Sequence, residues 1–233
     1  MVGKLRSGVT QLLKANGVTV LEGVASFETR NRLKITKGRR SQAVESGATV
    51  IATGSAPAIP GFIPDSPRVL DSRAFLDLTA LPAGLIVLGG GVIGCEFACM
   101  AAQLGVNVTV VEMLDDILPV LDPDIRRELR THMEKELGIT VLTGNPMENI
   151  AAGGRGVSGK AGDAAVEAEM MLVSVGRRPV TESLELHNAG LETDTTGAIQ
   201  TDAYCRTAAA TVYAAGDATA GSTQLAHAAT SQG

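Results

Sequence analysis

Tryptophan is absent from this sequence, and aromatic residues are scarce, at 3% of the chain. Stacking platforms for single-stranded nucleic acid depend on aromatic side chains, so this class of partner is disfavoured. Positive charge is also in short supply, because the formal net charge is −5. Proteins that bind phosphate backbones or anionic membranes are favoured by a net positive charge, which this chain lacks. We therefore expect neither nucleic acid nor a membrane as the partner.

Cysteines and long apolar runs are equally few. Three cysteines, an odd number, do not make a disulfide framework and favour a reducing compartment. The apolar runs 81–95 and 97–111 have 15 residues each and fall short of the roughly 18 residues of a membrane span. No basic stretch with a following apolar run opens the chain, so we expect no signal peptide. These absences predict a soluble, cytoplasmic protein, and no histidine has the spacing of a metal ligand.

Glycine is abundant instead, with 27 residues. The apolar periodicity after Pro82 predicts strands over 85–88, 106–111 and 139–142, and helices over 95–104 and 122–137, the second with Asp122 as N-cap and Pro123 in first position. This alternating order is typical of a Rossmann-like α/β fold with a parallel sheet. Short apolar runs between 147 and 174 predict a small antiparallel meander, and 170–175 a further buried strand.

The N-terminal part of the chain has a different pattern. It predicts a helix over 4–15 and strands over 18–27, 32–36 and 48–52. Prolines crowd residues 57–67, which excludes a helix or a central strand there and indicates a linker between domains. We expect 81–201 to form an NAD-binding domain. Residues 1–80 and 202–233 would then form a partial, discontinuous FAD-binding domain.

An internal repeat supports two related nucleotide-binding units. Residues 50–57 and 172–179 share one pattern, an apolar strand, a small or branched residue, Gly, two residues and then Pro. A glycine-rich turn precedes the second copy at residues 89–94, and none precedes the first. The first unit therefore resembles a unit truncated at its N-terminus.

Residues 89–94 fit the motif G-x-G-x-x-G between an expected strand and an expected helix. The first Gly makes the turn, the second lets a pyrophosphate approach the backbone, and the third packs helix against strand. Glu112 ends the next expected strand, where a carboxylate would bind the adenosine ribose hydroxyls and repel the extra phosphate of NADP. The alternative is a plain glycine turn beside a solvated Glu. Strand, turn, helix and acid together favour NAD.

Three further features have ordinary explanations that we weigh against functional ones. Cys95 and Cys99 lie at helical spacing, and we expect inert packing residues rather than a redox pair. Asp115 and Asp116 are expected to be solvated turn residues. The apolar run 211–215 leads into Gly216-Asp217, which either binds a sugar-like hydroxyl chain or merely ends a strand.

Taken together, these segments resemble the flavin-dependent pyridine nucleotide-disulfide oxidoreductases, and among them the dihydrolipoamide dehydrogenase type. The matching segments are 52–54, 88–96, 108–113, 117–119, 175–179, 212–217 and 225–227. The resemblance implies that the NAD site contains Gly89, Gly91, Val92, Ile93, Gly94, Glu112 and Gly176, with Glu96 facing the nicotinamide end. It implies FAD as second cofactor of the complete protein, with Thr53, Gly54, Gly216 and Asp217 in the flavin site and with Ala226 and His227 near the isoalloxazine ring.

Departures from the family pattern limit what the resemblance implies. The family's flavin-binding glycine turn, its Cys-x-x-x-x-Cys pair and its His-Glu acid/base pair have no match here. We therefore expect the NAD-binding central portion of such an enzyme, without catalytic residues and inactive alone. The complete protein would be a homodimer, and a monomeric state stays open for this chain. The alternatives are an NADH oxidase, a mercuric or other disulfide reductase, or a non-catalytic NAD-binding module, for which Thr53, Gly54, Gly216 and Asp217 would have no use.

Overall fold

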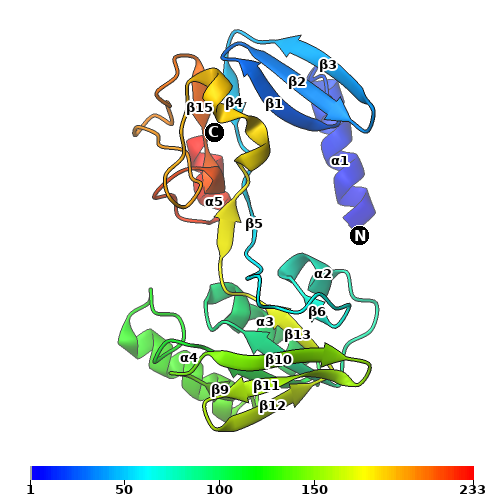
Figure 1. Cartoon of the computed structure of the whole chain (residues 1–233), viewed down its shortest axis with the longest axis vertical. Helices are drawn as coiled ribbons and strands as arrows, with labels where there is room; N and C mark the ends of the chain where they lie inside the picture. The colour runs from blue at the N-terminus through cyan, green and yellow to red at the C-terminus, as the bar shows by residue number, and fades with distance from the viewer. Residues whose placement is uncertain (1) are drawn as a thin grey trace. The chain divides into compact units, whose positions relative to one another are not determined.

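A computed structural model describes residues 2–233 and divides the chain into two compact units. Unit 1 comprises Met1–Ser55 and Pro179–Gly233, and unit 2 comprises Ala56–Arg178. The chain passes between the units at β5 (Ser55–Pro57) and β14 (Arg177–Pro179), which pair as two strands (Figure 1).

A parallel sheet forms the centre of unit 2. Its five strands have the order β6-β13-β7-β8-β9. Their bounds are β6 (Val69–Leu70), β13 (Met170–Val173), β7 (Gly84–Leu88), β8 (Asn107–Val111) and β9 (Thr140–Leu142). β7 is buried along almost its whole length, which suits a strand covered on both faces. The expected α/β fold class is confirmed, since β7, β8 and β9 are joined by helices as the sequence pattern predicted.

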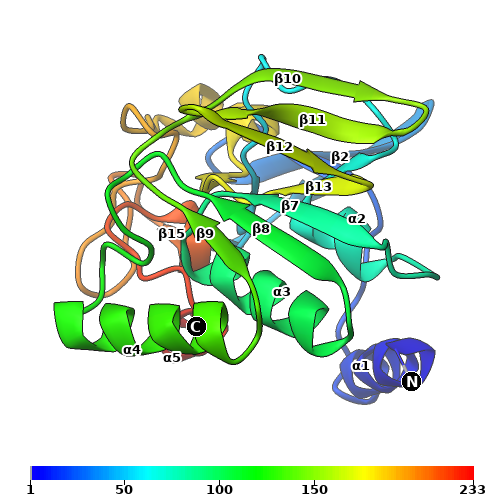
Figure 2. The same cartoon turned by 90° about the horizontal axis from the view of Figure 1, so that it is seen from below.

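Two helices cover one face of this sheet, α3 (Val92–Gln103) and α4 (Pro123–Lys135) (Figure 2). The core between them contains small residues of α3, such as Ala98 and Ala101, which are completely buried and allow the helix to approach the strands closely. Met133 of α4 is likewise fully buried in this core. α4 begins at the expected Pro123, but the side chain of its N-cap, Asp122, makes no capping hydrogen bond.

An antiparallel meander covers the other face, as the sequence predicted (Figure 2). It consists of β10 (Met147–Gly153), β11 (Gly156–Ala161) and β12 (Ala164–Ala168). Its inward side chains, including Val157 and Val166, form a second core with Ile86 and Met171 of the parallel sheet. Unit 2 is therefore built from three layers.

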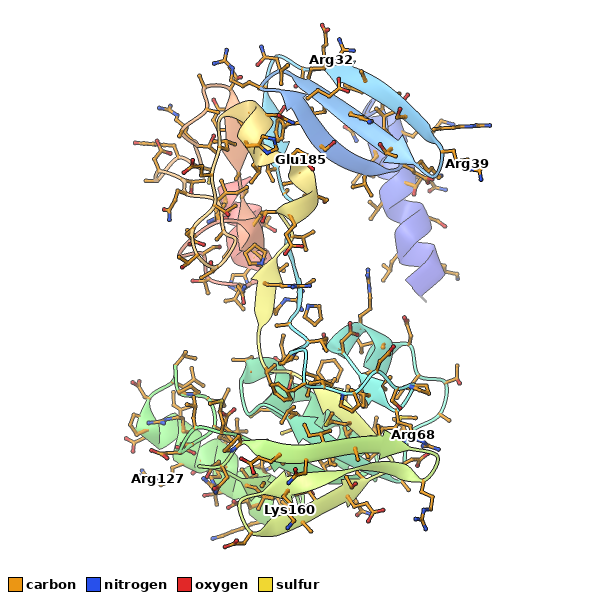
Figure 3. All side chains as sticks on the ribbon, in the orientation of Figure 1. Arg32, Arg39, Arg68, Arg127, Lys160 and Glu185 are labelled. Carbon is orange, nitrogen blue, oxygen red and sulfur yellow. The ribbon has the colours of Figure 1, made fainter. Side chains whose placement is uncertain are left out.

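The segment 56–80 belongs to unit 2, and not to unit 1 as the sequence led us to expect. Its strand β6 extends the parallel sheet beside β13, and the short helix α2 (Ser72–Leu76) inserts Phe75 into the core. The Phe75 ring meets Phe97 edge-on, with ring centroids 5.3 Å apart. Arg68, labelled in Figure 3, donates hydrogen bonds to the backbone oxygens of Gly154 and Glu169. These contacts place the domain boundary near residue 55 instead of 80.

Unit 1 contains a meander and a parallel strand pair. The meander consists of β1 (Val24–Thr29), β2 (Arg32–Lys37) and β3 (Arg40–Glu45) in that order. β3 was not expected from the sequence, because only one of its residues is even partly buried. The parallel pair is β4 (Thr49–Ile51) with β15 (Val212–Ala214). On the surface of the meander, Nε of Arg32, labelled in Figure 3, donates a hydrogen bond to Oε2 of Glu28 at 2.8 Å.

Short helical turns complete the core of unit 1: η1 (Glu182–Leu184), η2 (Leu186–Ala189) and η3 (Gly216–Ala218). Leu184, Leu186 and Ile199 are buried with Phe27 and Ile51, which explains why 179–201 joins this unit instead of the other. The terminal helices are α1 (Val2–Ala15), close to the expected 4–15, and α5 (Ala226–Gln232). Over residues 2–233, no helix combines the length and the apolar character of a membrane span.

Candidate nucleotide-binding sites

The turn between β7 and α3 contains glycines at which an added Cβ would clash with neighbouring atoms. Gly89 has a φ of +107°, and a Cβ there would lie 2.5 Å from the Ser174 oxygen. A Cβ on Gly94 would lie far inside contact distance of the Gly89 oxygen. The first and last glycines of the motif thus serve the tight turn and the close packing that the spacing predicted.

Gly91 differs from its neighbours, because a Cβ on it would meet no atom within 4 Å. It is the N-cap of α3 and makes no side-chain capping bond, so the first backbone N–H groups of the helix are left for an external acceptor. The next residue, Val92, is 48% exposed. An open backbone at a helix N-terminus is the geometry that suits a pyrophosphate.

Glu112 lies at the carboxyl end of β8 and is only 8% exposed. Its Oε2 accepts a hydrogen bond from Gly90 N at 2.6 Å, and its Oε1 accepts one from Leu114 N at 2.8 Å. In the structure, this carboxylate connects the glycine turn to the loop after β8, which the sequence did not predict, and its role as a ribose acceptor stays a prediction. A carboxylate has about four acceptor positions, so further hydrogen bonds remain open to it.

Gly176 follows β13 and has a φ of +115°. A Cβ on it would meet no atom within 4 Å, so the backbone there is also accessible. Ser174 was not singled out from the sequence. Its hydroxyl lies 3.0 Å from the Leu88 oxygen and 3.1 Å from the Gly89 oxygen. Ser174 therefore holds the glycine turn from the neighbouring strand.

Two cysteines and a glutamate lie on α3 behind the turn. Cys95 is 3% exposed, and burial, with smaller effects of Cys99, Glu112 and Glu96, raises its pKa to about 12. Burial also raises the pKa of Cys99. Both thiols are free, and Cys95 is buried whereas Cys99 is partly buried. Glu96 and Ile93 lie on the first turns of this helix, with Glu96 exposed to solvent.

A second cluster lies in unit 1, where β4 and β15 end side by side. Because these strands are parallel, with Ile51 opposite Ala214, the segments that follow them meet at one edge. Thr53 and Gly54 follow β4, and Gly216 and Asp217 follow β15. Ser55, which the sequence did not point out, donates to the Asp217 carboxylate at 2.6 Å. The structure thus brings four of the residues that the resemblance assigned to a flavin site, Thr53, Gly54, Gly216 and Asp217, to one edge of this strand pair.

Helix α5 meets this cluster through its last residue. Gln232 Oε1 accepts a hydrogen bond from Gly216 N at 2.7 Å, so the turn after β15 is tied to the helix. Ala226 and His227 lie on the first turn of α5 and are exposed. Among residues 2–233, no three His, Cys, Asp or Glu side chains gather in a way that could hold a metal ion.

Asp116 departs from the expectation of a solvated turn residue. Its carboxylate lies 3.4 Å from Nη1 of Arg126 and 3.4 Å from Nη1 of Arg130, both on α4. It also accepts a hydrogen bond from Ile117 N at 2.9 Å. The loop after β8 is therefore anchored to α4, which sequence reasoning missed because the partners lie on a separate element.

Curated relatives match this chain over its whole length. Dihydrolipoyl dehydrogenase 2 of Haloarcula marismortui is 41% identical over 242 residues, which cover 100% of this chain and 51% of that protein. The dihydrolipoyl dehydrogenase of Bacillus subtilis is 35% identical, again with 51% of its length covered. The chain thus spans about half the length of the curated relatives it matches.

Solved structures agree with this comparison. LpdA from Mycobacterium tuberculosis has a TM-score of 0.89 and 32% identity, covering 99% of this chain and 52% of that one. The HOCl-induced flavoprotein disulfide reductase RclA from Escherichia coli has a TM-score of 0.91 and 30% identity, covering 99% and 53%. The family model described as pyridine nucleotide-disulphide oxidoreductase matches residues 1–233. The resemblance drawn from the sequence is thereby confirmed, and the chain belongs to the pyridine nucleotide-disulphide oxidoreductases, flavoproteins that use FAD with a nicotinamide nucleotide.

Proposed function

We propose that unit 2 binds NAD at the carboxyl edge of its parallel sheet, as part of a dihydrolipoyl dehydrogenase-type flavoprotein. The observation that carries this proposal is the contrast within the glycine turn. Gly89 and Gly94 are closed by neighbouring backbone, whereas Gly91 is open at the helix N-terminus. The residues therefore fit a pyrophosphate, which needs close approach to the backbone at one glycine only.

In this proposal, the N–H groups of Val92 and Ile93 bind the pyrophosphate, and Gly176 lines the site from the end of β13. Glu112 orients the adenosine ribose through its remaining acceptor positions. Its negative charge disfavours the 2′-phosphate of NADP, so NAD is the preferred nucleotide. The bound nicotinamide would supply a hydride acceptor or donor, with Glu96 at that end of the site.

We further propose that unit 1 contributes to the flavin site. Asp217 would accept hydrogen bonds from the ribityl chain, and its orientation is supported by the Ser55 hydroxyl at 2.6 Å. Thr53 and Gly54 would line the same site because the parallel strands β4 and β15 bring them beside Gly216. Ala226 and His227, exposed on α5, would lie near the isoalloxazine ring.

The chain by itself is proposed to leave lipoamide unreduced. Reduction of a disulfide needs a thiolate beside the flavin, and the pair Cys95 and Cys99 is unsuited to this, because burial raises both pKa values. The flavin would also be held weakly. Hydrogen bonds from the unit 1 cluster contribute about 0.5–1.5 kcal/mol each, or up to roughly 3 kcal/mol for those of the Asp217 carboxylate, whereas nanomolar retention of the flavin needs roughly 12 kcal/mol.

Calorimetric titration of the full chain with NADH and NADPH tests the nucleotide proposal. Wild type should bind NADH more tightly, and Gly91→Ala should weaken NADH binding by about tenfold or more, which corresponds to about 1.4 kcal/mol. Gly154→Ala is the matched control, since a Cβ there also meets no atom within 4 Å and lies away from the turn. Equal loss in both variants, or tighter binding of NADPH by wild type, contradicts the proposal.

A separate experiment tests the proposed lack of activity. The purified chain should show no flavin absorbance near 450 nm and no reduction of lipoamide by NADH. A yellow preparation that turns over would refute this part and leave the NAD proposal to its own titration.

A further inference from the structure

The peptide unit between Gly89 and Gly90 is held at both of its polar atoms by side chains. Its N–H, on Gly90, donates to Oε2 of Glu112 at 2.6 Å. Its carbonyl oxygen, on Gly89, lies 3.1 Å from the hydroxyl oxygen of Ser174. Glu112 follows β8 and Ser174 follows β13, the two strands on either side of β7. One peptide of the glycine turn is therefore clamped from both neighbouring strands.

The Ser174 hydroxyl has two carbonyl oxygens within reach. It lies 3.0 Å from the Leu88 oxygen as well, but a hydroxyl has one proton and donates to one acceptor at a time. The Leu88 oxygen already accepts the backbone N–H of Ser174 at 2.8 Å. The Gly89 oxygen is therefore the acceptor for which the hydroxyl matters most.

Glycine on both sides makes this peptide easy to rotate. Gly89 has a φ of +107°, and glycine reaches both signs of φ at little cost. Because the N–H and the carbonyl of a trans peptide point in opposite directions, a half-turn of the unit would exchange them. The Gly89 oxygen would then face the Glu112 carboxylate, and the N–H that holds this acid would be turned away. Ser174 opposes the rotation because it binds the oxygen in its present direction.

The pyrophosphate-binding end of the turn depends on the same peptide. Gly89 N donates to the Val111 oxygen at 2.8 Å, and the Gly90 oxygen accepts a hydrogen bond from Leu118 N at 2.9 Å. With the clamp, every polar backbone atom of these two glycines has a partner. Helix α3 begins two residues later, at Val92, with the N–H groups proposed to bind the pyrophosphate. Their direction is therefore set by the clamped peptide.

We propose that Ser174 is a positioning residue for nucleotide binding, which acts through the Gly89–Gly90 peptide on Glu112. This inference deepens the proposed NAD function and rests on it. Ser174 keeps the peptide in the direction in which Gly90 holds the carboxylate, and Glu112 then presents its remaining acceptor positions to the ribose. Only molecules with the peptide in this direction are ready to bind, so the measured affinity falls with their share of the population.

Ser174→Ala tests this role in the full chain. NADH should bind about fivefold more weakly in a calorimetric titration, the effect of one net hydrogen bond. In the free protein, hydrogen exchange should accelerate at the Gly90 amide, although Glu112, the partner of this amide, is unchanged. The acceleration should exceed that at Val110, which is completely buried in β8 and reports unfolding of unit 2 as a whole.

Ser66→Ala is the matched control. It removes another partly buried serine hydroxyl of unit 2, which accepts a hydrogen bond from Arg68 N at 3.3 Å. This variant should keep the wild-type NADH affinity and the wild-type exchange rate at Gly90. Ser174→Thr retains a hydroxyl at the clamp and should restore both quantities towards wild type.

Ser174→Cys replaces Ser174→Ala if the alanine variant does not fold. A thiol fills a similar space and is a weak donor, so NADH affinity and Gly90 protection should both fall again. Unchanged NADH affinity, unchanged exchange at Gly90, or equal acceleration at Gly90 and Val110 overturns the positioning role alone, provided that wild type binds NADH. Wild type that binds no NADH overturns the proposed function together with this inference.

Discussion

The buried carboxylate of Glu112 should contribute to the stability of unit 2 before any nucleotide binds. Glu112→Ala removes the acceptors of Gly90 N and Leu114 N, at 2.6 Å and 2.8 Å. Gly90 is buried, so its N–H would be left unsatisfied at a cost of about 1–3 kcal/mol, whereas Leu114 is exposed and regains water. With the lost charge-assisted bonds, we expect a total loss of about 2–4 kcal/mol.

Thermal unfolding followed by circular dichroism measures this loss. About 1 kcal/mol shifts the Tm of a domain of this size by roughly 4 °C, so the expected decrease is roughly 8–16 °C. Glu167→Ala, at an exposed position on β12, is the control, and its free energy of unfolding should lie within about 0.5 kcal/mol of the wild-type value. Hydrogen exchange should show faster exchange of the Gly90 amide in Glu112→Ala only. If Glu112→Ala has the same Tm as wild type and its Gly90 amide stays protected from exchange, the reasoning is refuted.

Further predictions concern the glycine turn and the thiol behind it. Gly94→Ala should destabilise unit 2 by about 1–3 kcal/mol or more, because the added Cβ would collide with the Gly89 oxygen. Urea unfolding measures this loss, and a free energy of unfolding equal to that of Gly91→Ala would contradict the prediction. Cys95 should resist alkylation in the folded chain at pH 8, since a pKa of about 12 leaves only about one thiol in ten thousand ionised, and rapid labelling detected by mass spectrometry would count against it. Because this pKa is raised above its unfolded value of 9.0, the contribution of the thiol to stability is present below pH 9 and is lost as the pH rises towards 12.

Local patterns were sufficient to predict most of the parallel sheet. The strands at 84–88 and 107–111 differ from the expected ranges by one residue at their starts, because apolar runs between glycines leave few alternatives. The helix after the glycine turn begins at Val92 and not at residue 95. Gly91 already serves as N-cap, so the last glycine of the motif lies inside the helix, where close packing requires it.

Tertiary contacts decided what local patterns could not. The segment 56–80 contains many prolines, and its membership of unit 2 depends on two-residue pairing of β6 with β13 and on Phe75 in the core. Neither feature produces a periodic signal. Strand β3 carries Arg40, Ser41 and Gln42 on exposed positions, so pairing with β2 and not burial makes it a strand.

The site shows the same division between local and distant information. Gly89, Gly91 and Glu112 follow from spacing along neighbouring elements. Ser55 and Asp217 are 162 positions apart, and only the parallel pairing of β4 with β15 brings them to 2.6 Å. Ser and Asp are also common turn residues, so neither gives a distinctive signal in the sequence.

Gly90 belongs to the local glycine motif and also contacts residues of the distant loop after β8. It occupies a position at which the motif G-x-G-x-x-G accepts any residue, yet a Cβ there would lie 2.8 Å from Ile117 Cγ2 and 3.1 Å from Glu112 Cβ. The same residue donates its N–H to the Glu112 carboxylate at 2.6 Å. A larger residue at position 90 would push the acid away from the turn. Glycine at position 90 and the buried position of the Glu112 carboxylate therefore depend on each other. The nucleotide preference proposed for Glu112 depends on both.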